Sequence, residues 1–113
     1  MTKYIQFLSI SLIIQLFFCT LYAQTTTWIG TNDTNWNLAS NWSNGVPASS
    51  YDVIINVGSF EPQITSNVTI QSLNIQAGAS LNITSGSLII STTTNNQGDL
   101  LLNGGNLETQ GNL

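Results

Sequence analysis

Short apolar triplets recur at a constant spacing in the second half of the chain, and this repeat limits the available folds more than any other feature. Leu81-Asn82-Ile83 aligns with Leu100-Leu101-Leu102 at an offset of about nineteen residues. The same offset aligns Leu88-Ile89-Ile90 with Leu107-Glu108-Thr109. With a slip of about one residue, the spacing also relates Ile83 to Ile64, Ile90 to Ile70, and Leu73 and Ile75 to Val53 and Ile55. Three strand-like triplets per repeat predict an all-β fold, a three-sided parallel β-solenoid with coils of about 19–20 residues.

The repeats divide the chain into a regular and an irregular part. Residues 52–113 are predicted to be the first coils of the solenoid, with glycines such as Gly78 and Gly86 at the corners between strands. A coil cannot bury its apolar edges alone, so neighbouring coils must stack on it. No helix, charged strand or proline closes the stack near Leu113, and we therefore expect an open end and a longer solenoid of which this chain is the amino-terminal part.

Residues 24–51 read as an amino-terminal cap on the solenoid. The stretch Thr25–Ile29 is β-prone, and the following segment is rich in Asn, Ser, Gly and Thr. Trp28, Trp36 and Trp42 lie close together in this otherwise polar sequence. Buried together, they would cover the first coil, which otherwise presents bare apolar surface and unpaired backbone groups.

Residues 1–23 have the pattern of a secretory signal peptide. Lys3 precedes the mostly apolar stretch from Ile5 to Phe18, and Ala23 supplies a small residue before Gln24. The apolar stretch is short for a membrane-spanning helix, which disfavours a retained anchor. We therefore expect a secreted or cell-surface protein that does not insert into a membrane once the signal is removed. Cys19, the single cysteine, lies in the segment expected to be removed, so no disulfide framework is predicted.

The charge of the chain excludes one class of partner. Its formal charge is -4, and Lys3 is its only Lys or Arg. Residues 24–113 therefore lack the cations that neutralise phosphates, which excludes nucleic acid as a partner. The segment is rich in Ile, Val and Thr, so the low charge indicates folded β structure rather than disorder.

The order of the tryptophans and of the strand after them resembles a known group of proteins. The residues concerned are Trp28-Ile29-Gly30, Trp36, Asn41-Trp42, Gly45-Val46-Pro47, Asp52-Val53-Ile54-Ile55, the run from Leu73 to Ala79, and Leu81. This arrangement resembles the amino-terminal region of large secreted and cell-surface proteins of Bacteroidota. The resemblance implies a right-handed parallel β-helix, adhesin-like modules further on, and secretion by the type IX route.

No catalytic constellation is evident, and we expect no enzyme activity, no metal and no cofactor in this segment. Its five acids are scattered over loops and strand edges, with no basic group after Lys3 to assist them. Two runs offer oxygen ligands for calcium, the one around Asn32-Asp33 and the one from Asn95 to Asp99. Neither matches a calcium-loop pattern, and turn chemistry explains both. Asp52 is expected to accept from backbone donors where the cap meets the first coil.

Three hypotheses for function remain open. The first is a structural or adhesion-type scaffold, whose partner is the rest of its own longer chain. The second is a carbohydrate-binding module in which Trp36 and Trp42 stack on a polysaccharide or cell-surface glycan. The third is the leading part of a polysaccharide-degrading enzyme with its active residues beyond Leu113. The first predicts buried tryptophans, and the second predicts that one or both are exposed.

Overall fold

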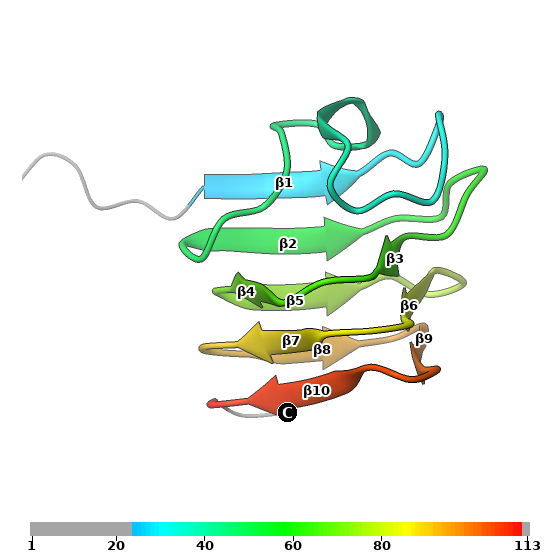
Figure 1. Ribbon diagram of the computed structural model, residues 1–113. Helices are drawn as coiled ribbons and strands as arrows, with labels where there is room; N and C mark the ends of the chain where they lie inside the picture. Colours follow the sequence, from blue (N-terminus) through cyan, green and yellow to red (C-terminus); the bar gives the residue numbers. More distant parts are fainter. Residues whose placement is uncertain (1–23, 112–113) are drawn as a thin grey trace, which may run out of the picture.

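The computed structural model describes residues 24–111 and confirms the all-β expectation (Figure 1). The expected signal peptide and its Cys19 lie outside these residues. The strands are β1 Gln24–Trp28, β2 Tyr51–Ile55, β3 Gln63–Ile64, β4 Val68–Ile70, β5 Ser72–Ile75, β6 Ser80–Ile83, β7 Ser87–Ile90, β8 Thr94–Asn96, β9 Asp99–Leu102 and β10 Asn106–Thr109. One short 3-10 helix, η1, spans Ala39–Asn41. Residues 29–50, which join β1 to β2 and contain η1, are called the cap loop below.

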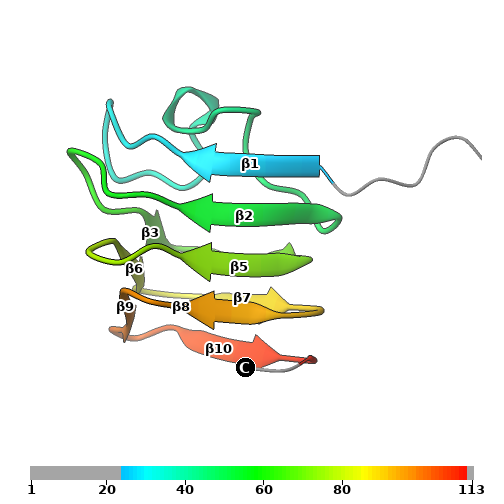
Figure 2. The same cartoon turned by 180° about the vertical axis from the view of Figure 1, so that it is seen from behind.

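The strands form three sheets, and all of their pairings are parallel. The strand orders are β1-β2-β5-β8, β3-β6-β9 and β4-β7-β10. Along the chain, β2, β3 and β4 visit the three sheets once each, and β5–β7 and then β8–β10 repeat the same circuit one strand further along (Figures 1 and 2). Each circuit is one layer of a stack, with β1 and the cap loop above the first layer.

The register of the sheets pairs the residues that align in the sequence. Leu81 pairs with Leu100, and Leu88 pairs with Leu107, each at a spacing of 19 positions. The remaining predicted pairs are Ile64 with Ile83, Ile70 with Ile90, Val53 with Leu73, and Ile55 with Ile75. Equivalent residues therefore stand directly above one another in columns.

The core lies between the three sheets. Alternate residues of each strand point inward, because successive side chains of a strand face opposite sides of its sheet. Along β5, Leu73 and Ile75 are buried while Ser72 and Asn74 are partly exposed, and β6 and β7 repeat this pattern. The buried apolar residues are Trp28, Trp36, Trp42, Val53, Ile55, Ile64, Ile70, Leu73, Ile75, Ala79, Leu81, Ile83, Leu88 and Ile90.

The short strand β8 was not expected from the sequence, which predicted polar turn chemistry at Asn95 and Asn96. Its residues pair with β5, with Thr94 beside Leu73 and Asn96 beside Ile75. Backbone hydrogen bonds at both ends of the pair, 3.0 Å from Leu73 N to Thr93 O and 2.9 Å from Gln97 N to Ile75 O, hold it there. The neighbouring strand, and not a local apolar pattern, makes this segment extended.

Candidate functional site

Three indole rings pack edge to face at one end of the stack. Trp28 ends β1, while Trp36 and Trp42 belong to the cap loop. The ring centroids of Trp28 and Trp42 lie 5.2 Å apart at an interplanar angle of 81°, and those of Trp36 and Trp42 lie 4.7 Å apart at 76°. Edge-to-face pairs of this kind add roughly 0.5–1.5 kcal/mol each to the burial of the rings. The three rings form one continuous cluster that covers the first layer.

The indole N–H groups of two of the three tryptophans are tied to backbone carbonyls. Trp28 Nε1 donates to Phe60 O at 2.9 Å, and Trp42 Nε1 donates to Trp36 O at 2.8 Å. Trp36 Nε1 is buried and has no hydrogen-bond partner. Only 1% of Trp36 and 4% of Trp42 is exposed. A glycan stacks on an exposed ring face, and in this conformation neither residue offers one. Packing within the cap loop explains why both Trp36 and Trp42 are buried.

Asn41 is the polar centre of the cap loop and is fully buried. Its Nδ2 donates to Asp33 Oδ1 at 2.7 Å and to Asn35 O at 3.0 Å. Its Oδ1 accepts from the backbone N–H groups of Asn32 and Asp33 at 3.3 and 3.4 Å. Outside the short helix η1 the cap loop has little regular structure, and this one amide supplies partners that a sheet would otherwise provide. The family resemblance includes Asn41, but no local pattern of the sequence predicts that it is the buried asparagine of this region.

Asp33 and Asn35 in the first run considered for calcium, and Asn96 in the second, use side-chain oxygens within the fold. Asp33 Oδ1 accepts from Asn41 Nδ2 and from Asn35 N, and Asn35 Oδ1 accepts from Asn37 N at 3.0 Å. Asn96 Oδ1 accepts from Gly98 N at 3.0 Å. The contacts of Asp33 with Asn35 N, of Asn35 with Asn37 N and of Asn96 with Gly98 N are turn contacts, in which a side-chain oxygen accepts from the backbone N–H two residues on. Across residues 24–111, no group of three or more His, Cys, Asp or Glu side chains is placed to hold a metal ion.

The cap loop forms hydrogen bonds along the outer edges of two strands, β1 and β3, each of which ends its sheet. On β1, Ser43 N donates to Thr27 O at 2.9 Å, and Asn44 Nδ2 donates to Thr25 O at 2.7 Å. On β3, Gln63 N donates to Thr34 O at 2.8 Å. The backbone groups that a further parallel strand would need at these two edges are therefore already paired. Within the range expected as the cap, 24–51, the structure has the sheet strand β1, the cap loop, and Tyr51 as the first residue of β2.

Asp52, at the junction of the cap loop and the first layer, contacts a side chain and not the backbone donors expected from the sequence. Its Oδ1 accepts from Ser72 Oγ at 2.6 Å. The two residues pair directly in the register of β2 and β5, so the bond links the first layer to the second. This is a structural contact on the outer face of the sheet.

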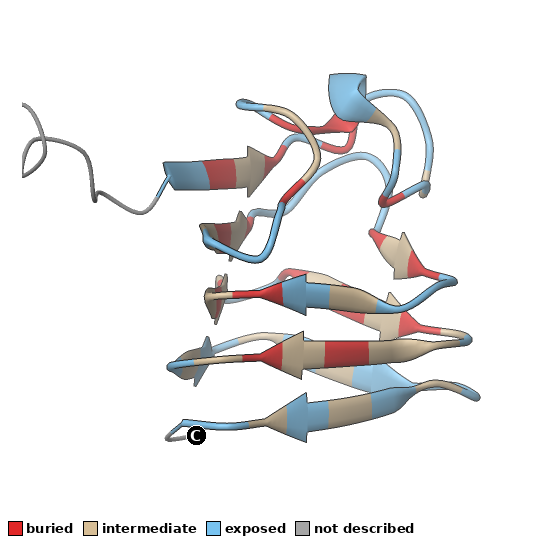
Figure 3. Cartoon of the chain, turned by 60° about the vertical axis from the view of Figure 1, so that its left-hand side comes forward, coloured by how far each residue is buried: buried red, intermediate tan, exposed pale blue. Residues whose placement is uncertain are grey.

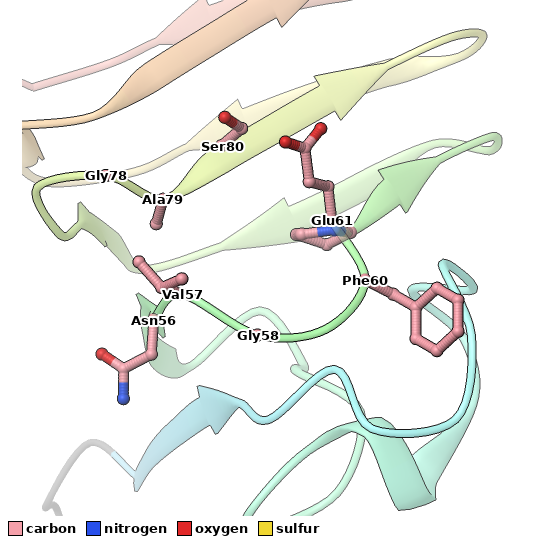
Figure 4. Close-up of a pocket in the computed structure, with 9 residues that line it drawn as sticks. Asn56, Val57, Gly58, Phe60, Glu61, Gly78, Ala79 and Ser80 are labelled. Carbon is pink, nitrogen blue, oxygen red and sulfur yellow. The ribbon is translucent and has the colours of Figure 1, made fainter.

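A shallow pocket lies where the loop after β2 passes the turn before β6 (Figure 4). Glu61 and Ser80 lie on its polar side, and Val57 and Ala79 on its apolar side, whereas the ring of Phe60 points away toward the cap loop. Its volume is about 60 Å³. Its one aromatic neighbour, Phe60, does not face it, so the pocket offers no ring on which a sugar could stack.

The layer farthest from the cap loop is incompletely covered (Figure 3). Leu100 and Leu107 occupy the same inward columns as the fully buried Leu81 and Leu88, yet both are partly exposed. Leu102 stands below the fully buried Ile83 and is 52% exposed. The difference arises because each buried residue has a layer on both sides, whereas β8, β9 and β10 end their sheets. We call the free edges of these three strands the open end.

These features define an all-β domain of three parallel sheets with a tryptophan-centred loop over one end. Residues 27–112 match the model of a domain of unknown function, DUF8693, and the chain belongs to that family. No curated protein and no solved structure showed a significant match. In residues 24–111 we find no helix of the length and apolar character that a membrane crossing requires.

Proposed function

We propose that this domain is the capped first section of an extracellular parallel β-solenoid that serves as a structural or adhesion-type scaffold, without catalysis of its own. The observation that carries the proposal is the pairing of each layer with the next, in parallel, at spacings of 19–21 positions in all three sheets. Such a stack grows by adding layers and presents long, flat outer faces, which suits a spacer or a display surface.

The cap loop supports the same function. A stack of coils must end in an element that pairs its backbone groups and covers its apolar end. The tryptophan cluster covers the first layer, and the cap loop occupies the outer edges of β1 and β3. With these two of the three sheet edges occupied, the scaffold has a defined starting point.

Export is part of the proposal and rests on residues 1–23, whose sequence has the charge and apolar pattern of a signal peptide. The absence of Lys, Arg and His from residues 24–113 supports a partner other than an anionic polymer. A surface of uncharged Asn, Ser and Thr suits contact with neutral glycans or with other parts of the same surface protein.

The test uses the full chain, expressed for export. We expect mass spectrometry of the exported protein to find a mature form that starts near Gln24. We also expect its tryptophan emission to be blue-shifted, protected from soluble quenchers, and unchanged by a panel of neutral and acidic polysaccharides. A red-shifted emission that saturates with one glycan would replace the scaffold by a carbohydrate-binding module. Retention of the uncleaved chain in the membrane would remove the extracellular part of the proposal.

A further inference from the structure

The strand on which the cap loop closes begins at Gln24, the residue that follows the expected signal peptide (Figure 1). Gln24 is exposed and pairs with Tyr51 in the register of β1 and β2. Cleavage after Ala23, which is part of the proposed function, makes Gln24 the first residue of the exported chain. A free α-amino group and a carboxamide side chain then belong to the same residue.

An amino-terminal glutamine can close into a lactam. Its α-amino nitrogen attacks Cδ of its own carboxamide, so that an N–Cδ bond forms and the Cδ–Nε2 bond breaks. One amine proton leaves with Nε2 as ammonia, and the product is the five-membered ring of pyroglutamate. Ring closure is favoured because the nucleophile and the carbonyl are held within one residue. The step needs no oxidant, reductant or second substrate.

The place of Gln24 in the sheet is compatible with the ring. Thr25 O and Thr27 O both accept from the cap loop, at the outer edge of β1. Backbone groups of successive residues point to opposite edges of a strand, so those of Gln24 face β2. The lactam keeps one N–H group, which can still donate toward β2. The ring itself takes the place of an exposed side chain.

Cyclisation would remove the one remaining positive charge of the exported segment. Lys3 lies in the part expected to be cleaved, and residues 24–113 contain no Lys, Arg or His. Once the signal is removed, the α-ammonium group of Gln24 is therefore the only cation in this segment, and it is also the only primary amine. The lactam replaces it with a neutral amide.

The same ring would shield the contacts that hold the cap loop. Thr25 O accepts from Asn44 Nδ2 at 2.7 Å, and Thr26 Oγ1 donates to Gly45 O at 2.9 Å. Exposed chain ends are preferred sites of proteolysis. An aminopeptidase that removed Gln24 and the two threonines after it would delete both contacts. A lactam offers such an enzyme no free amine.

We propose that Gln24 becomes the mature amino terminus and cyclises to pyroglutamate, which leaves residues 24–113 without a cation or a primary amine and shields β1 from stepwise proteolysis. The inference rests on the export part of the proposed function. It also goes beyond it, because a chain cleaved before Gln24 can be exported equally well with a free amine.

The experiment compares the full exported chain with the variant Gln24→Asn. Asparagine keeps the carboxamide but is one methylene shorter, so closure would require a strained four-membered ring. Mass spectrometry of the amino-terminal peptide gives the cleavage position and the mass. An amine-reactive ester, applied after unfolding in urea so that folding cannot hide the terminus, reports free amines. A digest of the folded proteins with a general aminopeptidase tests the shielding of β1.

We expect the wild-type chain to start at Gln24, to be lighter by one ammonia and to take up no label. Gln24→Asn should keep its full mass, take up the label and lose residues from β1 in the digest that leaves the wild type intact. A pyroglutamate-specific aminopeptidase should restore labelling of the wild type, at Thr25.

A wild-type chain that starts at Gln24 with full mass and takes up the label would overturn this inference and leave export standing. A cut at another residue would also overturn it. An uncleaved chain, recognised by label on Lys3, would overturn the export proposal together with this one. Equal loss of β1 residues from the wild type and Gln24→Asn would remove the shielding role.

Discussion

Asn41 Nδ2 lies 2.7 Å from Asp33 Oδ1, and this contact holds the two halves of the cap loop together. The amide is fully buried and uses both its donor and its acceptor atoms, whereas most neighbouring asparagines are exposed. The cap loop lacks regular pairing over most of its length, so a single side chain takes the place of a strand as its organising element.

We therefore expect Asn41→Leu to destabilise the domain strongly. The substitution keeps a similar volume but leaves the backbone N–H groups of Asn32 and Asp33, and the carbonyl of Asn35, without their partner. The loss in free energy of unfolding should be about 2–4 kcal/mol, measured by urea denaturation with circular dichroism. The control is Asn37→Ala, at an exposed position of the same loop, with an expected change within about 0.5 kcal/mol. Similar losses from both variants would contradict the role given to Asn41.

Substitutions at Trp36 and Trp42 compare a buried indole that has a hydrogen bond with one that has none, and so test the contribution of that bond to stability. Both are buried, but Trp42 Nε1 donates to Trp36 O, while Trp36 Nε1 has no partner. Replacement by Phe removes a similar volume and keeps an aromatic ring at each site, so the difference reports the bond together with the one additional ring contact of Trp42. Trp42→Phe should cost about 2–4 kcal/mol and Trp36→Phe about 1–2 kcal/mol. Urea denaturation of the two variants measures the two losses in free energy of unfolding. An equal loss from both, or a larger loss from Trp36→Phe, would show that the bond contributes nothing.

Alanine substitutions at Gly86 and Gly45 separate two costs to stability: the strain of a positive φ and the clash of an added Cβ with neighbouring backbone. Both have positive φ, 73° and 82°. A Cβ at Gly86 would lie 2.6 Å from Ser66 O in the layer above, whereas a Cβ at Gly45 meets nothing within 4 Å. Gly45→Ala should cost only the conformational strain, about 1–2 kcal/mol. Gly86→Ala should cost about 3 kcal/mol or more, because backbone must also move. Thermal unfolding of the two variants measures the difference, and equal melting temperatures would rule out a tight corner at Gly86.

Alanine substitutions of Leu81 and Leu101 test which side chains of the sheet β3-β6-β9 face the core and which face outward. Leu81 on β6 is fully buried, while Leu101 on β9 points outward and is 41% exposed. Leu81→Ala should cost about 2–5 kcal/mol from lost burial and the cavity it leaves. Leu101→Ala should change stability by about 0.5 kcal/mol or less. Urea denaturation of both, with unchanged m values, checks the assignment of faces. A large loss at Leu101 would mean that its outer face is covered in solution.

Much of the fold could be predicted because its layers leave a regular spacing of apolar residues in the sequence. An inward side chain in a stacked strand must be apolar when layers lie on both sides of it, so Leu73, Leu81 and Leu88 mark their strands and recur at the spacing of the layers. The register follows from the same columns, and the paired residues were those that the spacing predicted. Trp28, Trp36 and Trp42 likewise indicated a cluster, since the surrounding residues are too polar to form any other core.

Other features depend on neighbours that lie far away along the chain. β8 has polar inward residues, and it is a strand because β5 supplies its hydrogen bonds. Asn41 resembles the other asparagines of its segment until folding encloses it, when its four polar contacts replace water. Asp52 meets Ser72 because their strands pair, a distance of 20 positions along the chain. Apolar burial leaves a periodic signature in the sequence, whereas a hydrogen bond needs only one partner at the right place in space, and that place is set by the folded chain.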